Sequence, residues 1–278
     1  MPRFSRADIY RRQYKAIVVI FAVCFALVSI VTLVNTIAAG QPSESRANPT
    51  AAPTPAKARV MTIPETPADA PALSNIPRGV ELTGGESLGI DVSSHQKTIN
   101  WGDVADSGVS FAYIKATEGS GYTDPNFAAN WEGAWQAGIT PGAYHYFTLC
   151  SPGADQARDF LQVAPPDSGA LPPALDLEFD GACEKLPEAE HANAEVEAFV
   201  NAVEKAWGRK VVVYSSKEWR LHYGLPHADG RPDWLFSEHQ RPAQEDWAVW
   251  QLRFDGTVEG ISTKVDIDVI RPKHLKGD

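Results

Sequence analysis

Short apolar segments alternate with helix-forming segments along much of this chain, and that alternation constrains the fold more than any other feature. We predict five strands, each followed by a segment with helical periodicity or helix-capping residues, over residues 88–94, 111–117, 142–148, 173–179 and 210–216. Strands that alternate with helices form parallel βαβ units. Three further strands then follow with no helical pattern between them, over residues 234–239, 248–253 and 265–270.

The count and spacing of these strands predict a closed barrel. Eight strands within about 190 residues favour an α/β barrel. The loss of helices predicts that the last strands pair partly antiparallel, as hairpins. We therefore expect a modified TIM-like β/α barrel of eight strands with few helices after the fifth strand. An open doubly wound sheet is the alternative, and no glycine fingerprint for a nucleotide supports it.

The N-terminal region has the composition of a membrane anchor followed by a linker. Residues 16–34 are apolar and uncharged, long enough to cross a bilayer as a helix, and they follow a basic segment. The positive-inside rule places the basic segment in the cytoplasm. We assign four regions, a cytoplasmic segment, a transmembrane signal anchor, a disordered Pro/Ala-rich linker and a barrel domain, to residues 1–15, 16–38, 39–82 and 83–278.

These assignments predict a single-pass protein of the inner membrane whose barrel domain is exported to the periplasmic or extracellular side. A cleaved signal peptide is the alternative, because small residues at 36–40 could form a cleavage site, and the domain would then be secreted. The formal charge of −10 argues against a nucleic-acid partner, and we expect none. We expect a monomer.

One predicted strand carries two acids on the same face. Asp176 and Glu178 are two residues apart in the apolar run ALDLEF, so their side chains point the same way, with Cα atoms about 7 Å apart. Ionised carboxylates are costly in an apolar setting unless they are paired or functional. The simplest interpretation is that the strand ends here and that both acids face solvent or pair with Lys or Arg. A neighbouring pair can also divide into one acid and one base, as cleavage of a glycosidic bond requires.

Polar residues recur where the other strands end, which is the catalytic end of a β/α barrel. The first and last strands carry Asp91 and Asp266, and further polar and aromatic side chains near the strand ends are Tyr144, Tyr146, Tyr214, Trp250 and Gln251. Convergence of acids and aromatics at one end indicates a binding or catalytic site. No cluster has metal-ligand spacing, so we expect no metal and no cofactor.

Two of the three cysteines fit the same geometry. Cys24 lies in the apolar N-terminal run, whereas Cys150 and Cys183 follow the third and fourth strands. Their loops are neighbours at the same end of the barrel, and export would place them in an oxidising compartment. We predict a disulfide between Cys150 and Cys183, with two buried free thiols as the alternative.

Taken in order, these segments resemble a known family. The motifs GIDVSSHQ, FAYIKATEG, GAYHYF, ALDLEF, VVVYSS, VWQ and VDIDV span residues 87–272 and resemble glycoside hydrolase family 25, the Chalaropsis-type lysozymes or N-acetylmuramidases. The resemblance implies a hydrolase that cleaves the β-1,4 bond between N-acetylmuramic acid and N-acetylglucosamine in peptidoglycan.

The resemblance also implies roles for the matched residues. Glu178 corresponds to the acid/base and Asp176 to its partner, while Asp91 and Asp266 match the acids of the first and last strands. Asp176 could act as a nucleophile or could orient the 2-acetamido group of the substrate, and the family favours the second route with retention. The aromatic residues Tyr144, Tyr146, Tyr214 and Trp250, with Gln251, would bind sugar.

Two departures and two alternative functions remain open at this stage. Asp268 stands where the family often has Asn, and WLFSEHQ on the sixth strand differs from the family's usual aromatic–alanine pattern. A non-catalytic module that binds peptidoglycan could use the same groove. A hydrolase of another N-acetylated glycan, such as chitin, would suit the acid pair equally well.

Overall fold

A computed structural model describes residues 60–179, 183, 185–224, 230–238 and 240–276. These residues all belong to one compact unit, which spans residues 57–278. The predicted cytoplasmic segment, the membrane anchor and residues 39–59 of the predicted linker lie outside the described residues. Within the described part of the chain, no helix is both long enough and apolar enough to cross a bilayer.

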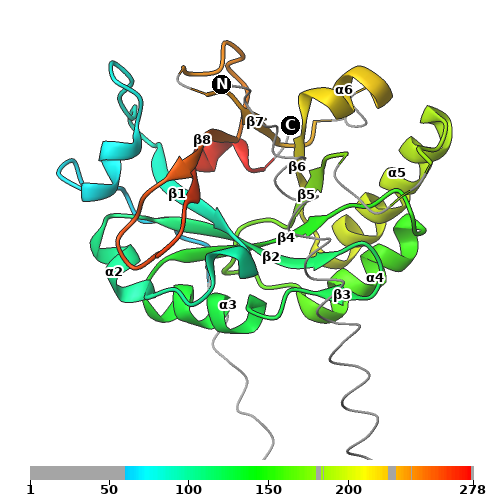
Figure 1. The fold of residues 1–278 in the computed structure, drawn as a ribbon, viewed down its shortest axis with the longest axis horizontal. Coiled ribbons are helices and arrows are strands. Elements are labelled where there is room, and N and C mark those ends of the chain that lie inside the picture. The colour runs from blue at the N-terminus through cyan, green and yellow to red at the C-terminus, as the bar shows by residue number, and fades with distance from the viewer. Residues whose placement is uncertain (1–59, 180–182, 184, 225–229, 239, 277–278) are drawn as a thin grey trace, which may run out of the picture. The chain divides into compact units, whose positions relative to one another are not determined.

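The strands close into a barrel (Figure 1). In chain order they are β1 (Ser87–Val92), β2 (Phe111–Glu118), β3 (Tyr122–Thr123), β4 (Thr140–Tyr146), β5 (Ala174–Leu177), β6 (Val212–Ser215), β7 (Asp233–Phe236), β8 (Val249–Gly256) and β9 (Val265–Ile270). Their spatial order is β1-β9-β8-β7-β6-β5-β4-β2, and pairing of β1 with β2 closes the ring, while the short β3 adds to the edge of β2.

The strand directions divide the barrel into two parts. Neighbouring strands are parallel from β1 through β2, β4, β5, β6 and β7 to β8. Strand β9 is antiparallel to both β8 and β1. The eight-stranded barrel and the antiparallel pairing of the last strands confirm the fold expected from the sequence.

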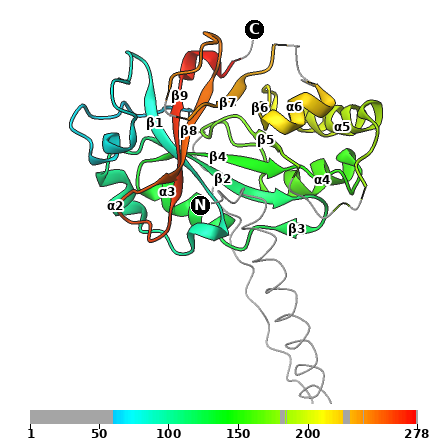
Figure 2. The same ribbon diagram turned by 45° about the horizontal axis from the view of Figure 1, so that its top comes forward.

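The helices are gathered on one part of the barrel, outside the parallel strands (Figure 2). The α-helices are α2 (Trp101–Asp106), α3 (Phe127–Gln136), α4 (Gly153–Val163), α5 (Ala189–Trp207) and α6 (Lys217–Tyr223), and the 3-10 turns are η1 (Pro71–Asn75), η2 (Ser94–Gln96) and η3 (Pro272–His274). The described residues after Tyr223 contain no α-helix. Helix α3 begins after Asn126, so the Asp124 carboxylate does not cap it and instead accepts from the amides of Ser94 and Asn126.

Alternation along the strands separates two apolar layers. The outward side chains, such as Ile90, Leu175 and Leu177, are fully buried under the helices in one large cluster. The inward side chains form a second cluster that contains Phe111, Tyr113 and the other aromatic residues of the barrel interior. Gly89 and Gly142 leave the space that these two rings fill, because a Cβ atom at either glycine would lie within 2.5 Å of the neighbouring ring. The lower part of the interior is therefore a packed core.

Residues 60–82 pack against the barrel, although the sequence analysis assigned them to a disordered linker. The Thr140 hydroxyl donates to the Thr62 carbonyl at 2.6 Å, and the Leu88 amide donates to the Thr66 hydroxyl at 2.7 Å. Met61 and Ile63 pack against the inner cluster. The prolines of this segment are compatible with an extended backbone, and that backbone offers its carbonyls as acceptors instead of joining the sheet. The segment has no apolar periodicity, so its sequence did not indicate that it packs against the barrel.

Asn75 joins the same segment to the hairpin of β8 and β9. Its amide nitrogen donates to the Thr257 carbonyl at 2.9 Å, and its side-chain oxygen accepts from the Thr257 amide at 3.0 Å. Arg253 donates to the Asn75 carbonyl at 3.2 Å. The segment therefore braces strands that have no helix beside them.

Candidate active site

The acid pair lies at the carboxyl end of β5, which ends at Leu177, so that Asp176 is in the strand and Glu178 follows it. Asp176 stands in register with Tyr146 of β4 and Tyr214 of β6. Its neighbours Leu175 and Leu177 are fully buried on the outer face, so the half-buried Asp176 faces the interior. Glu178 follows the last strand residue and is also half-buried. Phe179 packs against Trp219 of α6 on the outer side, which leaves Glu178 between two outward-facing residues.

A second pair of acids comes from the antiparallel strands. Asp91 of β1 and Asp266 of β9 are directly opposite each other in the register, and both are half-buried. The amide nitrogen of Gln251, on β8, donates to the Asp91 carboxylate at 2.9 Å. The acids expected from the first and last strands are thus cross-strand neighbours.

Tyr144 of β4 links the two sets of acids. Burial raises the pKa of its phenol well above the usual value, and the negative charges of Asp91, Asp176, Asp266 and Asp124 raise it further. The charges of carboxylates from β1, β5 and β9 therefore all act on the Tyr144 hydroxyl, which lies between the two pairs of acids. Tyr144 is 9% exposed and remains a neutral hydrogen-bonding group.

Asp268 lies deeper than the other acids and is completely buried. It stands opposite Gly89 of β1 and Gln251 of β8. Its pKa is raised well above the usual value, first by burial and then by the charges of Asp91 and Asp266, while a hydrogen bond from Trp234 acts in the opposite direction.

The predicted sugar-binding aromatics divide into two groups. Tyr144, Tyr146 and Tyr214 alternate onto the inner face, and the Lys115 ammonium lies 4.6 Å from the centre of the Tyr146 ring. Trp250 instead points outward, is fully buried in the outer cluster and donates to the Ser237 carbonyl at 2.9 Å. Trp250 and Gln251 are adjacent on β8, so only one of them can face the interior, and that residue is Gln251.

Trp234 is an interior aromatic residue that the sequence did not indicate. Its indole nitrogen donates to Asp268 at 3.1 Å, and its ring lies 4.8 Å from that of Tyr113 and 5.9 Å from that of Tyr214. The available signal was its strand position, because Trp234 stands in register with Tyr214 across the parallel pair of β6 and β7.

His145 is a structural residue of the outer layer. Its ring stacks on Phe199 of α5 at 4.6 Å between centroids, and its nitrogens bond to Thr117 and Gln156. Burial lowers its pKa to about 3, so the ring is neutral. Its neighbours Tyr144 and Tyr146 face the opposite way, because side chains alternate along β4.

The structure joins Cys150 and Cys183 in a disulfide, with 5.3 Å between their Cα atoms. The bridge links the segment after β4 to the segment after β5, beside the acid pair. Among the described residues, no group of three or more His, Cys, Asp or Glu side chains could hold a metal ion. Lys115 forms an ion pair with Glu118.

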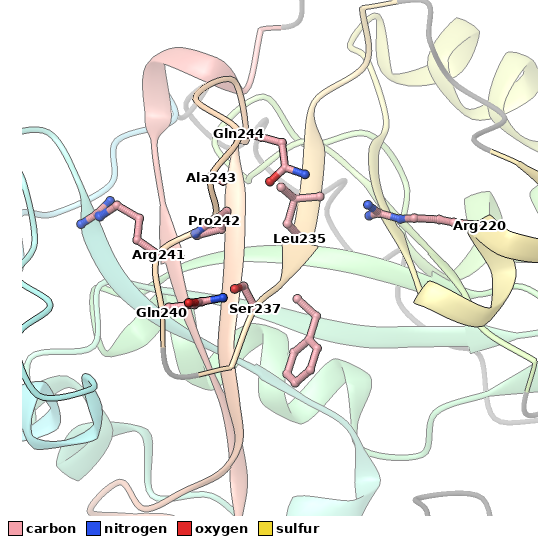
Figure 3. Close-up of a pocket in the computed structure, with 9 residues that line it drawn as sticks. Arg220, Leu235, Ser237, Gln240, Arg241, Pro242, Ala243 and Gln244 are labelled. Carbon is pink, nitrogen blue, oxygen red and sulfur yellow. The ribbon is translucent and has the colours of Figure 1, made fainter.

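A separate cavity of about 310 Å³ lies beside the end of β7 (Figure 3). It is lined by Leu235, Phe236, Ser237, Arg220 and residues 240–244. The Arg220 guanidinium points toward β7 across this space and is held by Ser215, whose carbonyl and hydroxyl accept from Nε. None of the acids described above lines this cavity.

The geometry provides carboxylates on two sides of the catalytic end of the barrel, with the neutral Tyr144 between them. Such an arrangement can hold one carboxyl group protonated while another stays ionised, because neighbouring negative charges disfavour further ionisation. A protonated and an ionised carboxyl group together can supply general acid and general base catalysis. Aromatic rings on the same face can pack against a sugar.

Comparison with known proteins gives consistent matches. The sequence profile of glycosyl hydrolases family 25 matches residues 90–261. The uncharacterized protein YegX of Escherichia coli K12 is 38% identical over 190 residues, which cover 65% of this chain and 68% of that protein. Lysozyme M1 of Streptomyces globisporus is 34% identical over 203 residues, with 64% of this chain and 65% of the relative covered.

A solved structure agrees with the sequence matches. The crystal structure of the bacterial lysozyme from Streptomyces coelicolor has 32% sequence identity to this chain and a TM-score of 0.62. The superposition covers 70% of this chain and 96% of that lysozyme.

Proposed function

Because the chain belongs to the glycosyl hydrolases of family 25, we propose that it is a lysozyme that hydrolyses the β-1,4 bond between N-acetylmuramic acid and N-acetylglucosamine in peptidoglycan. The observation that carries this proposal is the convergence of two carboxylate pairs: Asp91 and Asp266 stand opposite each other on β1 and β9, Asp176 and Glu178 lie at the end of β5, and the charges of three of these acids act on Tyr144. Lysozyme M1 and the Streptomyces coelicolor lysozyme support it as relatives with that activity in their names.

In the proposed reaction, Glu178 donates its proton to the glycosidic oxygen as the bond to the anomeric carbon breaks. Asp176 orients the 2-acetamido group, whose carbonyl oxygen attacks the anomeric carbon and forms a cyclic oxazolinium intermediate. Glu178, now ionised, takes a proton from water as that water opens the intermediate. Two displacements at one carbon give retention. Direct attack by Asp176 is the competing route.

The remaining acids would act through their charge. The negative charges of Asp91 and Asp266 would favour the protonated form of a neighbouring carboxyl group. They would also stabilise the positive charge that develops on the sugar. Tyr146 and Tyr214 stand on either side of Asp176 in the register and would contact the sugar rings there.

The decisive experiment compares Glu178→Gln with the unaltered chain on purified peptidoglycan. We expect a loss on the order of 10²–10⁴-fold in the release of new reducing ends, which is the usual contribution of a general acid/base group. Glu190→Gln, an exposed change on α5, is the matched control and should keep full activity. Full activity of the Glu178→Gln chain would contradict the role.

The same assay separates the two alternative functions. A module that only binds the wall would sediment with peptidoglycan and release no reducing ends from it. A hydrolase of another N-acetylated glycan would act on chitin oligosaccharides and leave peptidoglycan intact. Mass spectrometry of the products identifies which sugar carries the new reducing end.

We further propose that residues 16–38 anchor the protein in the inner membrane and that the barrel is exported. The apolar run, the basic residues before it and a disulfide in the barrel support this location. Tethering would concentrate the barrel near the wall that it acts on. A mature protein whose N-terminus maps to the region after residue 38 would contradict the anchor and support secretion.

A further inference from the structure

We propose that Asp268 carries a proton in the working enzyme and donates a hydrogen bond from it to the Asp91 carboxylate, which makes Asp268 a positioning residue of the active site. The part of this inference that concerns activity rests on the proposed function. The part that concerns the proton does not, because it follows from the geometry of the barrel interior.

The first observation is the position of Asp268. Its side chain is 0% exposed, and its strand lies between β1 and β8. Its cross-strand partner on β1 is Gly89, which has no side chain that could pair with the Asp268 carboxyl group. An isolated ionised carboxylate in such a place is strongly disfavoured, and the group takes up a proton instead.

The second observation is the hydrogen bonding of its two oxygens. Oδ1 accepts from the indole nitrogen of Trp234 at 3.1 Å. Oδ2 is buried and receives no hydrogen from an N–H or O–H group of the described residues. Asp91 nevertheless acts on Asp268 both through its charge and as a side-chain hydrogen-bonding group, and both effects favour the protonated form of Asp268. Two carboxyl groups can share a hydrogen bond only when one of them holds a proton, and that proton accounts for the buried oxygen.

The proton belongs to Asp268 because the two acids have different surroundings. Asp91 is half-buried and accepts from the Gln251 amide nitrogen at 2.9 Å, which stabilises its charged form. Asp268 is fully buried and accepts one hydrogen bond from an uncharged donor, the Trp234 indole. A protonated Asp268 would hold Asp91 from one side while Gln251 holds it from the other, so that the Asp91 carboxylate has one orientation.

The groups that face Asp268 come from several elements. The titratable ones are Asp91 on β1, Asp266 on its own strand and Tyr113 on β2, and the neutral polar ones are Trp234 and Gln251. Burial and the two neighbouring acids raise the pKa of Asp268, and burial also raises that of Tyr113, which stays neutral. At high pH, ionisation of Asp268 would place two negative charges side by side and disturb Asp91.

The test uses Asp268→Asn, because an asparagine amide can donate to Asp91 and accept from Trp234 without titrating. We expect this variant to keep kcat/KM at neutral pH to within about threefold and to lose the alkaline decline in activity caused by Asp268. Asp268→Leu cannot donate, and we expect its kcat to fall on the order of 100-fold, the size that misplacement of a site group by about 1 Å can produce. An unchanged alkaline decline in Asp268→Asn would overturn the proposal.

Two measurements are independent of activity. In infrared spectra of the folded chain at neutral pH, subtraction of the Asp268→Asn spectrum from that of the original chain should leave the protonated carboxyl band of Asp268, since the contribution of Glu178 cancels, and this band should shift in Trp234→Phe. Because the folded form keeps a proton that the unfolded form releases, the stability of the original chain should also fall relative to Asp268→Asn as pH rises above the ordinary aspartate range.

The outcomes separate the two proposals. A chain with the carboxyl band but without hydrolytic activity in any variant would contradict the lysozyme and leave the protonated Asp268 in place. Absence of the band from the original chain at neutral pH would overturn the protonated Asp268, whatever the activity. If Asp268→Asn does not fold, the band of the original chain and its shift in Trp234→Phe decide the question.

Discussion

The two parts of the barrel are stabilised in different ways. Strands β2, β4, β5 and β6 are parallel and covered by helices, and aromatic side chains fill the layer between strands and helices. Strands β7, β8 and β9 follow one another with no α-helix among the described residues after α6, and β1 pairs antiparallel with β9. We call these four strands the seam. The seam includes the antiparallel pairs, and the segment of residues 60–82 packs against part of it.

At the seam, a buried cluster of charged residues joins neighbouring segments. The buried Glu86 accepts hydrogen bonds from Arg241, Arg271 and the Thr83 amide. The Arg271 guanidinium lies 3.7 Å from the centre of the Trp247 ring, a cation–π arrangement. The helix-covered part instead has His145, Phe147 and Phe160 packed around Phe199 of α5.

This difference matters because the candidate site takes residues from both parts. The helix-covered part supplies Asp176 and Glu178, and the seam supplies Asp91, Asp266 and Asp268. Apolar packing is insensitive to pH and salt, whereas an ion-paired cluster depends on the ionisation of its carboxylate. The two sides of the site should therefore respond differently to acid.

The largest expected effect tests the helix-covered part. Phe199→Ala removes a fully buried ring that contacts three other rings, and we expect a loss of about 4 kcal/mol in the free energy of unfolding. Urea unfolding followed by circular dichroism at several pH values measures it. The loss should be nearly independent of pH between neutral and mildly acidic conditions, because the neighbouring His145 is already neutral there.

The matched control for that change is at the seam. Phe254, on β8, is 45% exposed, so Phe254→Ala should cost less than about 1 kcal/mol. A loss for Phe199→Ala as small as that of Phe254→Ala would show that helix packing does not hold the parallel strands. A strong pH dependence of the Phe199→Ala effect would remove the contrast between the two parts.

The next largest effect tests the seam. The arginine and amide hydrogen bonds outweigh burial and lower the pKa of Glu86 to about 2, from 4.5. A group whose folded pKa is depressed adds stability above its unfolded pKa, and that stability is lost as pH falls from about 4.5 toward 2. The shift corresponds to about 3 kcal/mol. Glu86→Gln should lose about this amount at neutral pH, and the gap should close with acidification.

Thermal or urea unfolding of both chains across this pH range checks the prediction. Glu132→Gln, an exposed change on α3, is the control and should follow the original chain at every pH. A gap between Glu86→Gln and the original chain that stays constant down to pH 2 would mean that ion pairing at Glu86 does not stabilise the seam. In that case the charged cluster would be a packing feature only.

The features that the sequence revealed are those set by local patterns. Strand alternation placed Asp176 inward, and the change of pattern after residue 223 predicted antiparallel strands without helices. Both depend on periodicities of two or 3.6 residues that short segments carry on their own. The cross-strand meeting of Asp91 and Asp266 followed once the first and last strands were expected to close the barrel.

The features that the sequence did not reveal depend on contacts between distant segments. Residues 60–82 have no periodicity, and their backbone carbonyls become useful only beside residues such as Thr140. The strand containing Trp250 and Gln251 has apolar residues on both faces, so its pattern does not say which side is inward. Trp234 was not predicted either, because its role is to donate a hydrogen bond to Asp268, which lies on another strand.

The smallest expected effect concerns Trp250, which the sequence placed in the sugar groove and the structure places outside the barrel. Trp250→Phe removes the hydrogen bond to the Ser237 carbonyl, which is worth about 1 kcal/mol, and should lower stability by that amount or slightly more without changing KM for the glycan. Unfolding curves and steady-state kinetics measure the two quantities. Trp234→Phe is the matched change on the inner face and should alter kcat, because its indole holds Asp268. A raised KM with unchanged stability in Trp250→Phe would instead show that Trp250 contacts the glycan, and the substrate would then bind at the outer face of the seam.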